Sequence, residues 1–428
     1  MTLTDGLAWL DRHINLEATA GRVEGLSLER MRTLVELLGD PQQSYPVIHI
    51  TGTNGKGSTA RMITSLLAEA GLTVGTYTSP HLQTINERIA RNAEPIDDEE
   101  LAALLADLER LEPVVGVSNS YFELLTAAAL RWFADIAVDV AVVEVGLLGR
   151  YDATNVCDGT VAVVTNVGYD HTDGRDDWRA RIAEEKSGIV KPMSTLVLGE
   201  TDPDLAPIFH RAGAQEIWER ERDFDCESNE LAVGGRLLEL RTPSARYDEV
   251  YLSLHGAHQG DNAALALAAA EAFFAAPLAD DVVRDAFGSV TMPGRFEIVG
   301  REPLIVLDGG HSPEAATSVA ATLQDDFARG GQTILVVGML QPRDASSLLE
   351  ALEAESAAAV IACAPPSPRA IAAEEIADAA EALGARVIVE PDVAKAVERA
   401  RELASPEDAI LITGSLYVVG AARSHLLG

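Results

Sequence analysis

The stretch 45-YPVIHITGTNGKGSTARMITSLLAEA-70 decides the fold of the N-terminal part of the chain. Residues 45–52 are rich in β-branched apolar side chains and indicate a buried strand, and residues 57–70 have the periodicity of a helix. Between them lies a glycine-rich turn that contains Lys56. Such a turn offers backbone N–H groups and the positive end of a helix to an anion. The stretch therefore predicts a phosphate-binding loop.

This loop departs from the common pattern G-x-x-x-x-G-K-[ST]. Gly57 follows Lys56, the hydroxyl residues Ser58 and Thr59 come later, and Ile50 stands where the first glycine is expected. A glycine-rich turn with a solvated lysine is the alternative interpretation. The strand before the turn and the helix after it favour nucleotide binding, with Lys56 directed at the β- and γ-phosphates.

Apolar segments and helical segments alternate along the rest of the chain. Strands are expected at 71–80, 138–146 and 159–168, and helices at 97–111, 120–134, 259–276 and 280–287. This alternation is typical of a mostly parallel sheet with helices on both faces. Residues 223–254 instead predict a short antiparallel β segment.

A second unit begins near 291-TMPGRFEIVG-300, where proline and glycine mark a boundary. After it the alternation restarts with PLIVLDGG, TILVVGML, AAVIACAP, ARVIVE and AILITGS. A chain of 428 residues is also longer than a single hydrophobic core usually supports. We therefore expect an N-terminal P-loop ATPase-like α/β domain over residues 1–294 and a smaller Rossmann-like α/β domain over residues 295–428. The cleft between them is the expected ligand site.

Composition excludes several classes of partner. The formal net charge is −34, which disfavours nucleic acid and anionic membranes because both attract cationic surfaces. The three cysteines are far apart and odd in number, so neither a disulfide framework nor a metal knuckle is expected. The N-terminus lacks the pattern of a signal peptide, and no apolar run is long enough to span a membrane. These features predict a cytoplasmic protein.

The loop GTNGKGS resembles the ATP loop of the Mur ligase superfamily, and within it the folylpolyglutamate synthase/dihydrofolate synthase family. Other segments match that family in the same order along the chain. They are TSPHL (78–82), VVEVGLLGRYDATNV (142–156), VGYDHT (167–172), EEKSGIVKP (184–192), HGAHQGDNAALALAA (255–269), MPGRFE (292–297), LDGGHSPEAA (307–316), PPSPRA (365–370) and GSLYVVG (414–420).

The resemblance implies an ATP-dependent ligase that adds L-glutamate to dihydropteroate, to reduced folates, or to both. ATP would phosphorylate the carboxylate to an acyl phosphate, which the amino group of glutamate then attacks. Two alternatives remain open: another amide ligase of the superfamily, such as a cell-wall peptide ligase with a UDP-linked substrate, and a nucleotide-dependent binding module without ligase chemistry. The resemblance also implies a monomer that binds small molecules only.

For ATP, the resemblance implies contacts from the loop, from Asn262 near the adenine, from Arg295 toward the phosphates and from Asp308 near the ribose. His311 would support the γ-phosphate or the intermediate, and Lys56, Lys186 and His311 are the implied catalytic residues. The loop residues concerned are Thr53, Asn54, Gly55, Lys56, Gly57 and Ser58.

The same resemblance implies two magnesium ions, which would be held by Ser79, Glu144, His171 and Lys186. Mg²⁺ prefers oxygen ligands, so Lys186 would act as a CO₂-derived carbamate, which requires a neutral amine. Sequence alone favours the plainer interpretation of Lys186 as a surface lysine on a helix.

The pterin or folate would contact three segments, by the same resemblance. The implied residues are Val23, Glu24, Gly25, Leu26, Phe122, Tyr151, Asp152 and Ala153.

The sequence departs from the family at Leu148, where a second glycine is usual, at Tyr151, where leucine is usual, and at Ser312, where asparagine is usual. Asp344, in the segment GMLQPRD, is expected to keep an acidic role.

Overall fold

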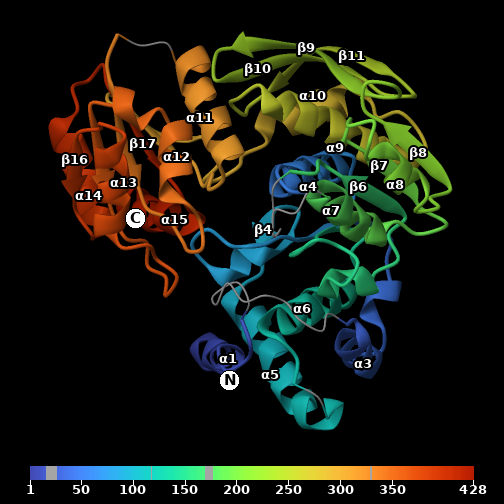
Figure 1. The fold of residues 1–428 in the computed structure, drawn as a ribbon. Coiled ribbons are helices and arrows are strands. Elements are labelled where there is room, and N and C mark those ends of the chain that lie inside the picture. Colours follow the sequence, from blue (N-terminus) through green and yellow to red (C-terminus); the bar gives the residue numbers. More distant parts are fainter. Residues whose placement is uncertain (16–26, 117, 169–176, 328–329) are drawn as a thin grey trace.

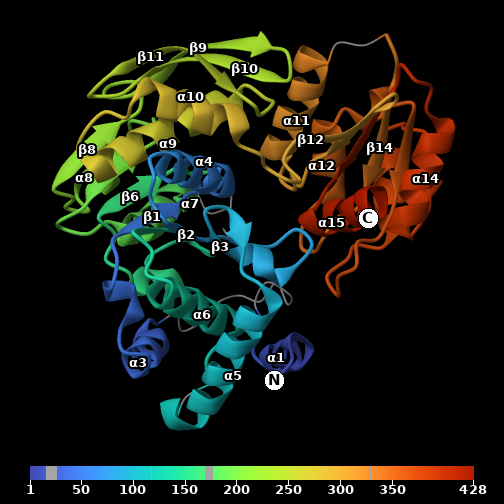
Figure 2. The same cartoon turned by 180° about the vertical axis from the view of Figure 1, so that it is seen from behind.

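The computed structural model describes residues 1–15, 27–116, 118–168, 177–327 and 330–428. Its strands form a sheet of eight, a sheet of three and a sheet of six. Figure 1 shows the six-stranded sheet and its helices as a separate body beside the rest of the chain, and Figure 2 shows the same arrangement from behind. The expected α/β class, with a small antiparallel element and a second α/β body, is confirmed.

The eight-stranded sheet has the order β4-β3-β2-β5-β1-β6-β7-β8 and is parallel except at one edge, where β3 and β4 run antiparallel. Its central strand β1 (Val47–Thr51) pairs with β5 and β6, and all five of its residues are buried. The other strands are β2 (Val74–Tyr77), β3 (Ile89–Arg91), β4 (Glu94–Pro95), β5 (Val140–Glu144), β6 (Val161–Val164), β7 (Thr195–Leu198) and β8 (Glu216–Glu219). Sequence analysis did not identify β3, β4, β7 or β8.

Helices cover both faces of this sheet. One apolar layer joins Ile48 and Ile50 to α4 (Lys56–Glu69), α9 (His258–Phe274) and α10 (Asp280–Ser289). The opposite layer joins Val47 to α1 (Leu3–Leu10), α3 (Glu29–Leu37), α5 (Asp98–Val115) and α6 (Tyr121–Asp135). Near β6 and β7 a third layer contains α7 (Trp178–Lys186) and α8 (Ala206–His210). No helix in the described residues is long and apolar enough to cross a membrane.

The small antiparallel sheet has the order β11-β10-β9 and closes over α9 and α10. Its strands are β9 (Asp225–Ala232), β10 (Gly235–Arg241) and β11 (Arg246–Leu252). One face contributes Leu238, Leu240, Val250 and Leu252 to the layer beneath, so alternate residues supply the buried face as expected for a half-exposed sheet.

The six-stranded sheet has the order β12-β13-β17-β14-β15-β16. Its strands are β12 (Glu297–Arg301), β13 (Leu304–Leu307), β14 (Thr333–Val337), β15 (Ala359–Ala362), β16 (Val387–Val389) and β17 (Ala409–Thr413). The helices are α11 (Pro313–Asp326), α12 (Ala345–Ala351), α13 (Ala373–Ala382), α14 (Val393–Leu403) and α15 (Leu416–Leu427). Short 3₁₀ helices occur at Pro41–Gln43, Ile85–Arg88, Ala153–Val156, Ser187–Ile189 and Ala354–Ser356.

The expected boundary segment 291–300 is not wholly a linker. Its last residues belong to β12, which pairs antiparallel with β13 across a short turn. The register shifts between Ile298 and Gly300. This irregularity shortens the apolar alternation and explains why the sequence did not indicate a strand there.

A buried ion pair joins the small sheet to the C-terminal body. Arg236 Nη1 lies 2.8 Å from Asp326 Oδ1, and their side chains are 10% and 2% exposed. Asp326 Oδ2 also accepts a hydrogen bond of 3.2 Å from Gly256 N, just before α9. One carboxylate at the end of α11 therefore holds both β10 and the start of α9.

Replacing Asp326 with alanine is expected to lower the free energy of unfolding by about 3 kcal/mol, because it leaves Arg236 buried without its counter-charge. Urea denaturation followed by circular dichroism measures this loss. Glu402→Ala is the matched control, since it removes one partner of the exposed Arg399–Glu402 pair and should cost less than about 1 kcal/mol. Equal losses in the two variants would contradict the role given to Asp326.

Candidate functional site

The predicted phosphate loop leaves the carboxyl end of β1 and is held by the segment that follows β6. Thr53 N donates to Asn166 O at 3.1 Å, and Asn54 N donates to Asn166 Oδ1 at 2.9 Å. Thr165 Oγ1 donates to Asn54 O at 2.6 Å. Sequence analysis missed Thr165 and Asn166, although both stand in the segment GTVAVVTNVG that it identified as a strand.

The two glycines beside Lys56 play different roles. Gly55 has a φ of +82°, and a β-carbon there would lie 2.5 Å from Asn262 Oδ1. This position therefore requires glycine, and Asn262 on α9 lies directly against the loop. A β-carbon at Gly57 would make only ordinary contacts, 3.4 Å from Met292 Cε and 3.7 Å from Glu144 Oε2. The unusual glycine after the lysine thus faces the predicted metal ligand.

Lys56 folds back over its own loop. Its Nζ donates to Gly52 O at 2.9 Å and to Thr53 O at 3.2 Å. Both acceptors are neutral carbonyls, so these contacts place the ammonium without neutralising its charge. The loop therefore offers a positive charge together with the start of α4, which is what a phosphate group requires.

Glu144 ends β5 and lies beside Ser79, which follows β2. The Glu144 side chain is 4% exposed, and its Oε2 accepts a hydrogen bond of 3.2 Å from Ser79 N. Burial raises the pKa of Glu144, while Lys56, the Ser79 N–H group, Arg295 and Arg88 oppose that rise. A buried carboxylate with so few donors suits a hard cation such as Mg²⁺.

The other predicted metal ligands are only partly placed. Among the described residues, no three His, Cys, Asp or Glu side chains lie close enough together to hold a metal. His171 lies outside the described residues. Of the predicted metal ligands, Ser79 and Glu144 are the two that the structure shows in contact.

Lys186 is not a surface lysine. It ends α7 and is 1% exposed, which rules out the plainer interpretation of its position. The adjacent turn of α7 is fastened to the loop after β5, because Arg150 N donates to Glu185 O at 2.8 Å. This hydrogen bond therefore connects the end of α7, where Lys186 lies, to the loop that is predicted to contact the substrate.

Arg295 and Asp308 lie where the two α/β bodies meet. Asp308 is 7% exposed, and its oxygens accept hydrogen bonds from Phe296 N at 2.8 Å and from Gly310 N at 2.7 Å. Burial raises the pKa of Asp308, and Arg295 is the strongest influence opposing that rise. The Arg295 charge also acts on Glu144. The charge of Arg295 therefore acts on a carboxylate of each body.

His311 and Arg343 add to this cluster. The pKa of His311 is lowered to about 3, chiefly by burial and then by the charges of Arg343, Arg295 and Lys56. Arg343 donates from Nη1 to His311 O at 3.0 Å. Sequence analysis missed Arg343, although the segment QPRD that contains it was compared with the family. Its position after β14 on a parallel sheet was the available signal.

Phe122, Tyr151, Asp152 and Ala153 lie in different environments. The Phe122 ring is partly buried, its centroid is 5.9 Å from that of Tyr77, and it covers Gly146 at the end of β5. Tyr151 is 43% exposed. In contrast, Asp152 accepts hydrogen bonds from its own loop and Ala153 lies in the core. Val23, Glu24, Gly25 and Leu26 lie outside the described residues.

The family departures have structural consequences. Leu148 has a φ of +59°, a backbone region that favours the glycine usual there, and its side chain packs against the α7 layer. Ser312 caps α11 by accepting from Ala315 N at 3.2 Å, as asparagine also could. Asp344 caps α12 through Ser347 N at 2.9 Å, so its acidic group has a local structural role.

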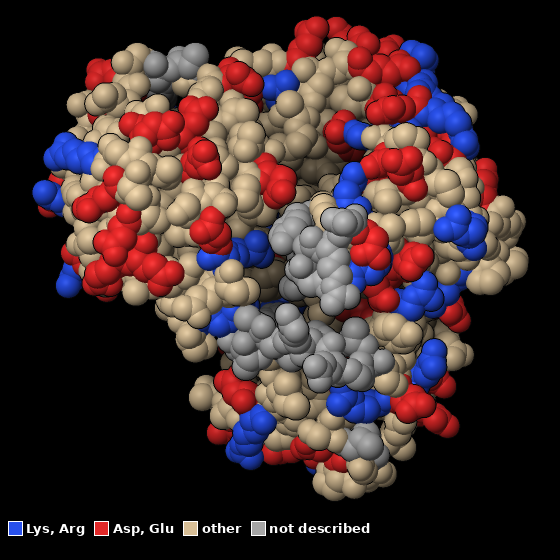
Figure 3. Space-filling view, in the orientation of Figure 1, with Lys and Arg blue, Asp and Glu red and all other residues tan. Residues whose placement is uncertain are grey.

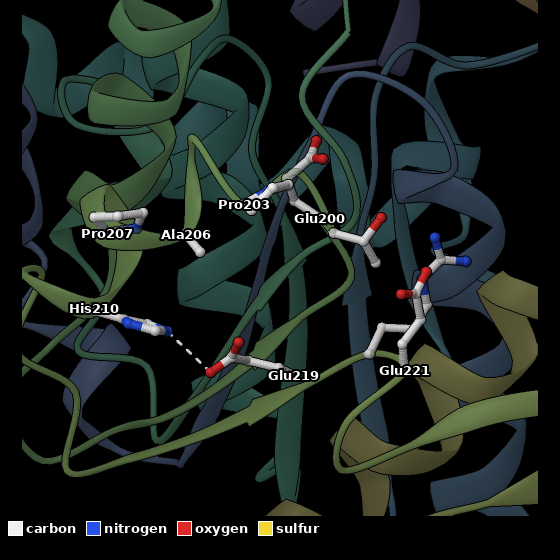
Figure 4. Close-up of a pocket in the computed structure, with 9 residues that line it drawn as sticks. Glu200, Pro203, Ala206, Pro207, His210, Glu219 and Glu221 are labelled. Carbon is white, nitrogen blue, oxygen red and sulfur yellow. Dashed lines mark hydrogen bonds and ion pairs between the residues drawn. The ribbon is translucent and has the colours of Figure 1, made fainter.

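A separate surface pocket of about 370 Å³ contains none of the predicted site residues. It lies between α8 and the chain around β8, where His210 bonds to Glu219 across it (Figure 4). Acidic side chains are widespread on the face shown in Figure 3, in keeping with the net charge of −34.

Comparisons with known proteins agree with this arrangement. Residues 50–270 match the Mur ligase middle domain, and residues 294–416 match the Mur ligase glutamate ligase domain. The dihydrofolate synthase/folylpolyglutamate synthase of Mycobacterium tuberculosis is 39% identical over 93% of this chain and 89% of its own length. The chain belongs to this family.

Two solved structures extend the match. The folylpolyglutamate synthase of Mycobacterium tuberculosis complexed with ADP and AMPPCP has a TM-score of 0.91 and 38% identity, over 99% of this chain and 98% of that one. A bifunctional folylpolyglutamate synthase/dihydrofolate synthase with Mn, AMPPNP and L-glutamate bound has a TM-score of 0.87 and 29% identity, over 100% and 98%. The shared fold therefore includes proteins that hold nucleotide, metal and glutamate.

Gly55→Ala is expected to weaken binding of a non-hydrolysable ATP analogue at least about tenfold, since the added methyl group meets Asn262 and the backbone favours glycine. Gly57→Ala, the matched control one residue beyond Lys56, should change the affinity less than about threefold, because its methyl group has room. Isothermal titration calorimetry measures both. A larger loss in the Gly57 variant would contradict this account of the loop.

Proposed function

We propose that this protein is an ATP-dependent ligase that adds L-glutamate to dihydropteroate and to the γ-carboxylate of reduced folates. The observation that carries this proposal is that charged groups of both bodies act on one another. The charges of Lys56 and Arg295 both act on Glu144 and on His311, and Arg295 also acts on Asp308. Family membership and the nucleotide, metal and glutamate bound by a related structure support it.

Activation of the carboxylate needs positioning and charge neutralisation more than covalent help from the protein. The charges of Lys56 and Arg295 both act on Glu144 and on His311, so together they would attract the phosphates and stabilise charge that moves during phosphoryl transfer. Asn262 is placed against Gly55 and lies where an adenine-side contact is proposed. Asp308 holds the backbone of Phe296 and Gly310, which steadies Arg295 on the phosphate side.

Metal would be held by Ser79, Glu144, His171 and a carbamate on Lys186. Bound Mg²⁺ supplies Lewis-acid stabilisation of phosphate oxygens. The deep burial of Lys186 supports the carbamate, because burial disfavours a charged ammonium and carbamate formation requires the neutral amine. Carbamate formation would replace the Lys186 ammonium with an anionic group whose oxygens can bind the metal.

His311 orients the incoming amine in this proposal. Its Nδ1 lies 3.0 Å from Gly309 O, and a carbonyl can only accept, so Nδ1 carries the hydrogen and Nε2 is an acceptor. With a pKa of about 3, the ring stays neutral near neutral pH and is a weak base. Nε2 therefore suits a hydrogen bond from the glutamate amine better than full removal of its proton. A monomeric, cytoplasmic enzyme remains part of the proposal.

Phosphate release from ATP with Mg²⁺ tests the function directly. Purified protein in bicarbonate buffer is offered glutamate with either dihydropteroate or tetrahydrofolate. We expect release with both substrates and none when glutamate is omitted. Release with one substrate alone narrows the activity to that substrate. Absence of release with both would exclude the folate assignment.

Gly146→Ala is expected to raise the KM for the pterin substrate about tenfold with little change in the KM for ATP. The added methyl group overlaps the Phe122 ring and must displace it, and one well-placed aromatic contact is worth about 1 kcal/mol. Steady-state kinetics measure both constants. Gly288→Ala, at an open position on α10, is the matched control and should leave both KM values unchanged.

A further inference from the structure

A chain of buried polar side chains joins the middle of β1 to the loop that follows β5. His49 is 0% exposed, and its Nε2 lies 2.9 Å from Thr154 Oγ1. The Thr154 hydroxyl lies 2.5 Å from Asp152 Oδ1, and Asp152 Oδ2 accepts a hydrogen bond of 2.8 Å from Leu147 N. The chain therefore runs from the core of the sheet to both ends of residues 147–154.

The direction of these hydrogen bonds follows from the groups that make them. Asp152 already accepts from Leu147 N and, at 3.0 Å, from Thr154 N, so its carboxylate acts as an acceptor. The Thr154 hydroxyl has one hydrogen, which goes to Asp152, and it must then accept from His49 Nε2–H. His49 is thus neutral with its hydrogen on Nε2, in keeping with the burial that lowers its pKa to about 3.

A second side chain of β1 holds the same loop. Thr51 Oγ1 donates to Leu148 O at 2.5 Å. Alternate residues of a strand face the same side, so His49 and Thr51 both point toward the loop, whereas Ile48 and Ile50 pack in the layer on the other face. Leu148 is the residue held at a φ of +59°. Strand β1 therefore fixes the loop at two points.

We propose that His49 is a positioning residue for the pterin side of the site. Acting through Thr154 and Asp152, it fixes the loop that carries Tyr151 and that begins beside Gly146, the residue covered by Phe122. Since β1 continues directly into the ATP loop, the same strand sets the distance between the two substrates. The identity of the substrate rests on the proposed function, but the link between His49 and the loop does not.

The choice of histidine supports this inference. His49 Nδ1 is buried and has no hydrogen-bond partner among the described residues, which carries a desolvation cost that an apolar side chain would avoid. If stability were the only requirement at position 49, leucine or valine would suit this buried and otherwise apolar strand better than histidine. Histidine supplies an N–H group within hydrogen-bond reach of Thr154, which leucine and valine cannot do.

The test compares four forms of the full-length protein. His49→Leu removes the donor with little change in volume, and His49→Gln restores an N–H group at a similar reach. Ile48→Val is the matched control, because Ile48 is equally buried in β1 but faces the opposite layer. Hydrogen–deuterium exchange of the Leu147 and Thr154 amides is measured without ligands, and KM values are measured for dihydropteroate and ATP.

We expect His49→Leu to speed exchange of both amides about tenfold and to raise the KM for dihydropteroate about tenfold, with the KM for ATP changed less than about twofold. His49→Gln should recover most of both effects, and Ile48→Val should show neither. Unchanged exchange in His49→Leu would overturn the inference, as would an equal rise in both KM values. A wild-type protein inactive with every pterin substrate would exclude the proposed function, while the exchange data would still decide the role of His49.

Discussion

Strand β1 is the constraint on which the site depends. Its five residues are all buried, and it is hydrogen-bonded to β5 on one side and β6 on the other, with Ile50 beside Glu144 and Thr51 beside Val164. Neither end of β1 can shift without breaking both ladders and both apolar layers. The predicted phosphate loop, Glu144 and the Thr165–Asn166 segment lie at the carboxyl ends of these three strands. Backbone hydrogen bonds therefore set their spacing before any side chain contributes.

For an anion bound near His311, the local charge matters more than the charge of the whole molecule. The chain carries a net charge of −34, yet Lys56, Arg295 and Arg343 all act on His311. At physiological salt, exposed charges are largely screened beyond about 8 Å. A phosphate or carboxylate beside these cations would thus experience them strongly and the distant acidic surface weakly. An acidic protein can in this way bind anionic substrates without a basic surface.

The sequence predicted the parts of the fold that local pattern determines. The buried strand, glycine turn and helix around Lys56 were predicted because each has its own periodicity or turn chemistry. Strand β12 was missed, since its register shift at Gly300 interrupts the alternation. The short strands β7 and β8 are defined by pairing with distant segments rather than by their own pattern. Local periodicity carries little information about such pairing.

The same distinction applies to the site. Family motifs indicated Lys56, Glu144 and Arg295, but no local pattern showed that Lys186 is buried or that Arg343 lies beside His311. Nor could the sequence show that His49 contacts Thr154, because the sheet brings these two residues together from 105 positions apart. The contacts of a residue depend on tertiary packing, whereas its presence in a motif does not.

Division of the site between two bodies has a chemical consequence. Asp308 joins Phe296 to Gly310, so Arg295 and the loop carrying His311 move together with the C-terminal body. That body is held against the other by the Arg236–Asp326 pair and by a 2.8 Å hydrogen bond from Gln83 to Ser424. The position of Lys56 relative to Arg295 and His311 therefore depends on these contacts between the two bodies. Phosphoryl transfer in the proposed reaction needs cations from both bodies around one phosphate, so the contacts between the bodies matter for catalysis as well as for stability.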